Sequence, residues 1–282
     1  MSATLSIPDL TAVKRFVANG MPLYTIRGIN EADESMRQAI YRTLIPDDLL
    51  VQYGIDPLSL CDAAGNRLVE FICPYGVSSA EVKVRHQAGA SDPLLYLQLA
   101  DTVNNQMCVM LFVVNDPSAP RFDVDRDWSG ERTKFGTVRR NLEAETAAMQ
   151  AGLAPGQLRR GLKLTRKRIP IFETFVSRLG HQIFFMEPLA YHTAILFERY
   201  GCAYSQGRAK MEWIHREFAP GGTLYKRLDG STPFRPPDAY RTIRGRSWAI
   251  HDGILGEPYT DVRMYNRVGI KGNVCTFPDA IW

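Results

Sequence analysis

The sequence predicts an α/β (α+β) fold in which helices flank a mixed, mostly antiparallel sheet. Three observations support this prediction. From Asn66 to about Asp127 the apolar residues alternate with a period of two, as they do in half-buried strands. From Leu158 to Leu179 they recur at intervals of three and four, as on one face of a helix. After Gly180, a short β-type segment and a second helical pattern add a further strand and helix.

Residues 1–60 predict an N-terminal helical cap on this core. Two stretches in this region carry helical patterns, IPDLTAVKRFVANG and NEADESMRQAIYRTLI. In the second stretch Asn30 and Glu34 supply a capping side chain and an early acid, which are typical of a helix start.

The segment from Asn66 to Asp127 predicts an antiparallel meander. Its apparent strands are RLVEFICP, AEVKVRH, PLLYLQLAD, QMCVMLFVV and RFDVDRD, and turn signals such as YGVSS and NDPSAP separate them. The acids of RFDVDRD resemble the start of a calcium loop, but Trp128 occupies the position that needs glycine and Lys134 the position that needs glutamate. We therefore expect an alternating strand there, with its acids on one face.

Two helices are predicted after the meander. TVRRNLEAETAAMQAG ends at Gly152, and QLRRGLKLTRKRIPIFETFVSRLG ends at Gly180, since glycine often follows the last helical residue. Pro170 lies inside the second helix and predicts a kink or a break. Six of the ten residues from Arg159 to Arg168 are basic, which indicates a positive local surface or simply a solvated helix face.

The last part of the chain, residues 219–282, is rich in Gly, Pro, Arg and aromatic residues and shows no clear period. It is too aromatic for disorder and predicts an ordered extension, packed on the core or on the neighbouring subunit of a homodimer. The domain organisation expected from the sequence is thus a cap at 1–60, a core at 61–218 and an extension at 219–282.

Composition narrows the class of protein. The chain has 282 residues, 45% of them hydrophobic, and five widely spaced cysteines without a C-x-x-C pair, which argues against disulfide and zinc frameworks. Neither a signal peptide nor an apolar run of about eighteen residues is apparent, so we expect a cytoplasmic protein without membrane contact. Thirty-four basic and thirty acidic residues argue against an extended nucleic-acid surface.

The order of elements, together with LFERYGCAYSQG, resembles the GNAT acyltransferase superfamily, mainly over Pro155 to Gly207. The end of that family's last conserved helix corresponds to Leu196, Phe197, Glu198, Arg199, Tyr200, Gly201 and Cys202. The resemblance implies a GNAT-like core and an N-acyltransferase that moves an acyl group from acyl-coenzyme A (acyl-CoA), its co-substrate, to a small amine-containing acceptor.

The family holds the coenzyme's pyrophosphate at a turn that begins its long helix. Backbone N–H groups and the positive end of the helix dipole suit an anion at such a position. Here PGQLRRGLK offers the corresponding residues, with a spacing that differs by one: Gly156, Gln157, Arg159, Arg160 and Gly161. The preceding helix, TVRRNLEAETAAMQAG, is a second departure from the family pattern.

The resemblance also implies a proton donor and a proton acceptor. Phe197 stands where the family often has the tyrosine that protonates the leaving thiolate, so Tyr200 or Tyr204 would have to replace it. By position, Glu187 and His192 are the candidate bases for the amine, although His192 could equally cap its helix or pack at the strand end.

Two other functions remain open at this point. His181, His192, His215 and His251 occur near Glu187, Glu198, Glu217 and Asp252, and two histidines with a carboxylate can hold a catalytic metal. A non-catalytic GNAT-like ligand-binding protein is the other alternative, because phenylalanine at position 197 cannot donate a proton.

Overall fold

A computed structural model describes residues 14–133, 136, 139–162 and 165–282, with the side chains of 165–168 left aside. The chain forms two compact units, and neither is continuous in sequence. Unit 1 comprises Met1–Pro117, Gly161–Glu187 and Tyr265–Lys271. Unit 2 comprises Ser118–Arg160, Pro188–Met264 and Gly272–Trp282. The division into 1–60, 61–218 and 219–282 stays a prediction.

Unit 1 begins with a hairpin where the sequence predicted a helix. Strands β1 (Val17–Ala18) and β2 (Met21–Pro22) pair antiparallel across Asn19 and Gly20, whose φ angles are 51° and 77°. An Asn-Gly pair with two positive φ angles is a favoured hairpin turn, so local turn chemistry overrides the helical pattern. Residues 7–13 of the predicted helix lie outside the described residues.

Three short helices follow: α1 (Ile26–Asn30), α2 (Glu34–Arg42) and α3 (Asp47–Gln52). The predicted cap at Asn30 is wrong, because α2 starts after Asp33 and Asn30 is the buried last residue of α1. Its Nδ2 donates to the carbonyls of Val77 and Ser79 at 2.7 and 2.9 Å, and its Oδ1 accepts from Tyr41. Asn30 therefore holds the helices to the start of a strand.

The predicted meander is confirmed for four strands: β3 (Val69–Ile72), β4 (Ser79–Val84), β5 (Leu95–Asp101) and β6 (Met107–Val114). They pair antiparallel in sequence order, and β7 (Ile183–Met186) then pairs parallel with β6. Among the described strands of the main sheet the order is β3-β4-β5-β6-β7-β9-β8. The main fold is thus mixed α/β with a mostly antiparallel sheet. Strand β9 (Arg263–Arg267) begins in unit 2 and ends in unit 1, and β8 (Ala203–Gln206) belongs to unit 2.

The expected fifth strand of the meander, RFDVDRD, is a turn-containing loop of unit 2. Its acids form local contacts: Asp125 pairs with Arg121, and Asp127 pairs with Arg139 at 3.0 Å. Hydrogen bonds from Ser129, then the contact with Arg139, lower the pKa of Asp127 to about 2. The acids of this segment thus form local ion pairs with arginines, and the segment does not form the backbone hydrogen bonds of a strand.

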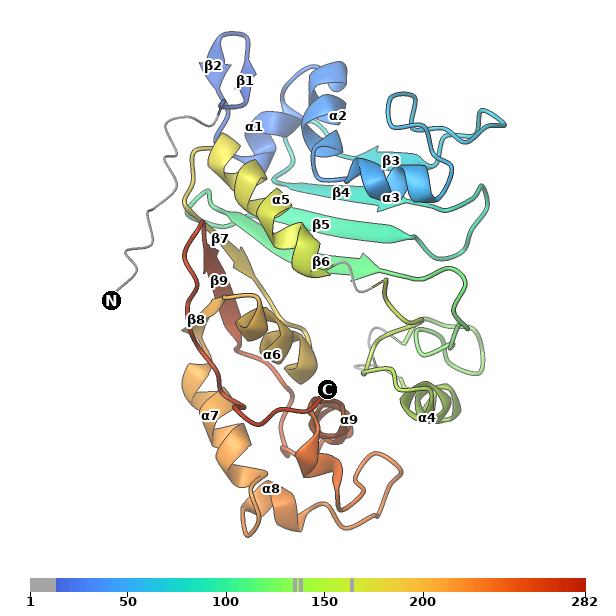
Figure 1. The fold of residues 1–282 in the computed structure, drawn as a ribbon, viewed down its shortest axis with the longest axis vertical. Helices are drawn as coiled ribbons and strands as arrows, with labels where there is room; N and C mark the ends of the chain where they lie inside the picture. Colours follow the sequence, from blue (N-terminus) through green and yellow to red (C-terminus); the bar gives the residue numbers. More distant parts are fainter. Residues whose placement is uncertain (1–13, 134–135, 137–138, 163–164) are drawn as a thin grey trace. The chain divides into compact units, whose positions relative to one another are not determined.

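Helix α5 (Thr165–Arg178) crosses the sheet of unit 1 (Figure 1). Its Phe172 packs against Phe112 of β6 and Phe184 of β7, with ring centroids 5.6 and 6.1 Å apart. The helix is continuous through Pro170, so no break occurs there. It spans Thr165–Arg178, whereas the predicted helix began at Gln157, and residues 157–162 are not helical. The basic side chains of Lys163 and residues 166–168 lie outside the described part of the chain.

Unit 2 is mainly helical. Its main helices are α4 (Leu142–Gln150), α6 (Tyr191–Arg199), α7 (Arg208–Glu217), α8 (Thr223–Lys226) and α9 (Ile243–His251), with a 3₁₀ turn, η2, at Ala239–Arg241. Helix α4 ends before Gly152 as predicted, although positions 137–138 of that prediction lie outside the described residues. Trp248 of α9 is buried, stacks on Phe234 at 5.2 Å and donates to the Leu153 carbonyl.

The sequence missed α9 because the helix is buried on most of its circumference. A helix surrounded by protein lacks the apolar stripe that periodicity detects. Across the described ranges, no helix is both long and apolar enough to cross a membrane.

Candidate functional site

Strands β6 and β7 of unit 1 form a fork. The eight-residue β6 pairs with the four-residue β7 only at Cys108 with Phe185 and Val109 with Met186. Beyond Val109, residues Leu111–Val114 of β6 pair, among the described strands, with β5 alone, and Met110 has no opposite residue on either β5 or β7. Alternate residues of a strand direct their N–H and C=O groups to opposite edges, so this part of β6 presents backbone groups toward the fork.

A β-bulge lies where the parallel pairing ends. On β5, Gln98 pairs with Leu111 and Leu99 pairs with Val109, which leaves Met110 without an opposite residue. A bulge bends its strand, increases the local twist and redirects backbone groups, and bulges are frequent next to active sites. The bulge at Met110 therefore gives a local reason for the divergence of β6 from β7.

Glu187, a base predicted from the sequence, lies at this fork. It follows Met186, the last β7 residue paired with β6, and it is half-buried. Continued parallel pairing would place it opposite Met110. Pro188 comes next and lacks the N–H that would continue a ladder, so β7 ends here.

Gly161, predicted to bind the coenzyme, lies close to the far end of the same edge. A Cβ added to Gly161 would lie 3.0 Å from the carbonyl oxygen of Val114, so any larger residue would crowd β6. Helix α5 begins at Thr165, four residues later. The predicted turn thus precedes the helix and is not its first turn, which corrects the expected geometry.

The other predicted coenzyme residues, Gly156, Gln157, Arg159 and Arg160, belong to unit 2. Gly156 has a φ of 79°, which favours glycine. The Gln157 side chain accepts from the Ala154 N–H at 2.7 Å, and Arg159 donates to the Ala119 carbonyl. Both side chains therefore hold their own loop in place.

His192 of unit 2, the second predicted base, is buried on α6. Its Nδ1 lies 2.9 Å from the Ser247 hydroxyl of α9. Burial, and then the charge of the nearby His251, lower the pKa of His192 to about 4. The imidazole is neutral at pH 7 and is a weak proton acceptor, which agrees with the packing role weighed in the sequence.

Tyr204, a predicted proton donor, is part of a second buried cluster in unit 2. Its hydroxyl donates to the carboxylate of Glu198, which also accepts from the N–H and hydroxyl of Thr276 at 2.9 and 2.6 Å. Burial, and then the charge of Glu198, raise the pKa of the Tyr204 phenol. These contacts favour a structural role. Tyr200 is the half-buried C-cap of α6, and its role stays a prediction.

A third buried cluster was not predicted from the sequence. Arg140 pairs with Glu145 and, at 2.8 Å, with Asp252, and Glu145 also contacts His251 at 3.2 Å. Arg235 completes it with a 2.7 Å contact to Asp252. Of the residues that the metal hypothesis would have used, Asp252 is paired with Arg140 and Arg235, and His251 contacts Glu145.

Two of the other predicted metal ligands have contacts of their own. His181 of unit 1 contacts the Tyr24 carbonyl, and His215 of unit 2 contacts Arg246. In the part of the chain that the structure describes, no group of three or more His, Cys, Asp and Glu residues could hold a metal ion.

Comparisons with known proteins assign no relative. No protein-family model matches this chain, and neither a curated protein nor a solved structure matches it.

Proposed function

We propose that this protein is an acyl-CoA-dependent N-acyltransferase with its reaction centre at the fork between β6 and β7. The observation that carries the proposal is the parallel pair that opens at a bulge, beyond which Met110–Val114 has no further strand partner among the described strands. The resemblance of LFERYGCAYSQG to the GNAT superfamily points independently to the same chemistry.

The coenzyme's pantetheine arm is an extended chain with two amide groups. Such a chain can add to an open strand edge through main-chain hydrogen bonds. In this proposal the arm lies along Met110–Val114, and the diphosphate lies toward Gly161 and the start of α5, where free N–H groups favour an anion. The thioester then reaches the bulge at Met110.

At the bulge the acceptor amine attacks the thioester carbonyl. A backbone N–H at Met110 stabilises the oxyanion that develops, and Glu187 accepts the proton that the amine loses. The tetrahedral intermediate collapses to an amide, and coenzyme A leaves as a thiolate. The resemblance assigns protonation of the thiolate to Tyr200 or Tyr204, and this assignment stays a prediction for both residues.

The proposal can be tested on the full chain by calorimetric titration with coenzyme A and acetyl-CoA, followed by hydrogen exchange. We expect binding, with slower exchange of the Met110–Val114 amides and unchanged exchange in β3 and β4. Binding that protects other amides would refute the location, and no binding of either compound at millimolar concentration would refute the function.

Turnover distinguishes the enzyme from a binding protein. Thiol release from acetyl-CoA is measured with a set of amines that includes amino acids, polyamines and aromatic amines. We expect release that depends on the amine and on Glu187. Coenzyme binding without turnover would favour the non-catalytic alternative, which is supported by Phe197 and by the Tyr204 hydroxyl bound to Glu198.

A further inference from the structure

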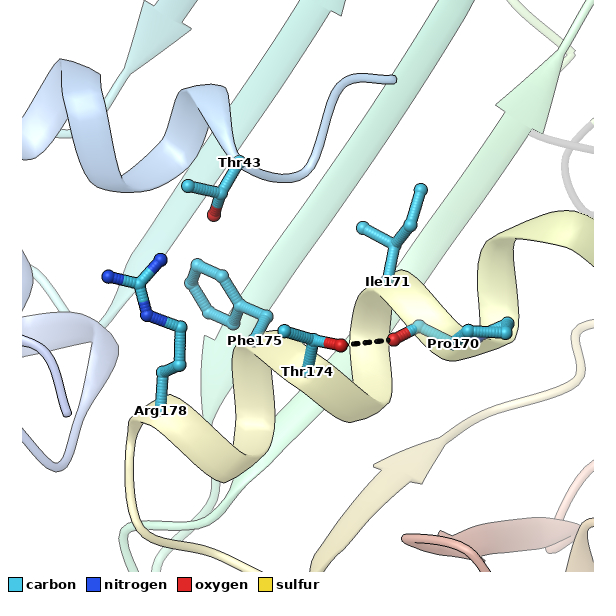
Figure 2. Close-up of a pocket in the computed structure, with 6 residues that line it drawn as sticks. All are labelled: Thr43, Pro170, Ile171, Thr174, Phe175 and Arg178. Carbon is cyan, nitrogen blue, oxygen red and sulfur yellow. Dashed lines mark hydrogen bonds between the residues drawn. The ribbon is translucent and has the colours of Figure 1, made fainter. Parts of the chain in front are cut away.

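A hollow in unit 1 lies against α5, on a side other than the one that packs on β6 and β7. It has a volume of about 220 Å³. Its lining residues come from α5 and from the C-cap of α2, as Figure 2 shows: Thr43, Pro170, Ile171, Thr174, Phe175 and Arg178. Phe172, which packs on the sheet, is not among them. The hollow is thus separate from the fork.

Arg178 brings a positive charge to this hollow. Its Cζ lies 4.0 Å from the centroid of the Phe16 ring, and its Nε donates to the Lys14 carbonyl at 3.1 Å. These contacts fix the guanidinium. Within the residues the structure describes, no carboxylate forms an ion pair with it, and burial alone lowers the pKa of Arg178. Among the described residues, this half-buried cation has no counter-ion.

The remaining lining restricts what could neutralise that charge. The hydroxyl protons of Thr43 and Thr174 are donated to the carbonyls of Ile40 and Pro170 at 2.6 and 2.8 Å. The Arg178 guanidinium is therefore the principal hydrogen-bond donor at the hollow. Pro170, Ile171 and Phe175 give the rest of the lining an apolar character.

We propose that this hollow binds a small carboxylate with an aromatic or branched aliphatic body, whose carboxylate accepts hydrogen bonds from Arg178. The planar guanidinium matches a carboxylate with two parallel hydrogen bonds. The apolar body takes the place of water on Ile171 and Phe175, as is usual in small-molecule sites. A volume near 220 Å³ suits a ligand of benzoate size and excludes a long acyl chain.

The test is calorimetric titration of the full chain with benzoate and isovalerate, beside benzyl alcohol and inorganic phosphate. Benzoate and isovalerate should bind more tightly than either comparison compound. Arg178→Gln should weaken benzoate at least about tenfold, because a charge-assisted hydrogen bond is lost. Thr174→Trp, at an exposed position, should fill the hollow and abolish binding even if Arg178→Gln fails to fold.

Arg27→Gln is the matched control, since Arg27 is an exposed arginine of the same unit and pairs with Glu31. It should leave benzoate binding unchanged. Failure of both benzoate and isovalerate to bind at millimolar concentration would overturn the proposal. Equal binding of benzyl alcohol, equal binding of phosphate, or full binding by both Arg178→Gln and Thr174→Trp would also overturn it. Thr174→Trp should still bind coenzyme A normally, because the hollow is separate from the fork. A failure of this proposal can therefore be distinguished from a failure of the transferase proposal.

Discussion

The fork of unit 1 and the buried clusters of unit 2 place polar groups in opposite situations. At the fork, backbone groups of Met110–Val114 lack, among the described strands, a partner on one side. In unit 2, charged side chains such as Arg140 and Glu145 are paired away from water. Residue types that suggest catalysis in the sequence, a histidine beside an acid, therefore stabilise the fold here. The candidate site depends on a backbone feature that has no chemical signature in the sequence.

Physical chemistry explains the difference. A buried charge persists only when partners compensate for its lost hydration, so Glu145, with 3% of its side chain exposed, requires Arg140 and His251. An open strand edge needs only water or a ligand to satisfy its N–H and C=O groups. Changes in unit 2 should therefore alter stability, and changes at the fork should alter binding and rate.

The largest effect is expected for Glu187→Gln at the fork. Transfer to an amine found active in the thiol-release assay should fall at least about a hundredfold, because the proton acceptor is removed. The free energy of unfolding, measured with urea, should change by less than about 1 kcal/mol, because Glu187 is only half-buried. A lower free energy of unfolding with an unchanged transfer rate would contradict the prediction, because Glu187 would then stabilise the fold and take no part in the reaction.

Glu145→Gln should produce the largest stability change in unit 2. The variant leaves Arg140 buried with one carboxylate fewer, which typically costs about 3 kcal/mol. The loss should appear as a lower urea midpoint. Glu143→Gln is the control, because Glu143 is exposed on the same helix and should change stability by less than about 0.5 kcal/mol. Equal effects of the two variants would contradict the importance of the buried cluster.

His192 should make stability depend on pH. Its pKa of about 4 in the folded chain lies below the ordinary value of 6.5, so the unfolded chain binds the proton first as the pH falls. Stability is full above pH 6.5 and falls toward pH 4, by about 2 kcal/mol between pH 7 and pH 5. Urea unfolding at several pH values should show this slope, and His192→Asn should reduce it.

His181→Asn, at an exposed histidine of unit 1, is the control for that experiment and should retain the slope. An unchanged slope in His192→Asn would show that another group is responsible.

Tyr204→Phe separates a structural hydroxyl from a catalytic one. Removing the hydroxyl deprives Glu198 of one of its hydrogen bonds and should lower stability by about 1 kcal/mol. We expect turnover to change less than about tenfold, since general acid catalysis is typically worth more than that. A hundredfold rate loss without a stability change would instead support the sequence-based assignment of Tyr204 as the proton donor.

The smallest changes in stability are expected for exposed ion pairs, and they should be equal in the two units. Arg27–Glu31 in unit 1 and Arg208–Glu212 in unit 2 are exposed pairs one helical turn apart. Glu31→Gln and Glu212→Gln should each cost about 0.3 kcal/mol, as exposed pairs do. A much larger loss of unfolding free energy in either unit would show that the contribution of such a pair to stability depends on more than its exposure.

The sequence predicted those elements whose patterns are local. The period of two identified β3 to β6, and the apolar pattern ending at Gly201 identified α6. Patterns could not identify α9, which is buried on most of its surface, and they wrongly predicted a strand at RFDVDRD, where acids pair with nearby arginines. Asn19 and Gly20 indicate the turn of the β1–β2 hairpin, but the apolar residues around them recur as in a helix and predict a helix instead.

The candidate site was only partly predictable. Glu187 and Gly161 could be proposed from position, but the open edge depends on pairing between segments far apart in the sequence. The sequence contains one indication of this edge. The apolar run QMCVMLFVV, which forms β6, is longer than HQIFFMEP, which contains its parallel partner β7. The structural roles of His192 and Tyr204 follow from their hydrogen bonds with Ser247 and Glu198, respectively. These contacts are visible only in the tertiary structure.

The interleaved order of the two units has a consequence for synthesis on the ribosome. Tyr265–Lys271 belongs to unit 1, so unit 1 receives this segment only after Pro188–Met264 of unit 2 has been synthesised. Chains normally fold domain by domain as they emerge. Here β6 must wait for α5 and β7 until Ser118–Arg160 of unit 2 has been synthesised, and the nascent chain has reason to engage a chaperone during that interval.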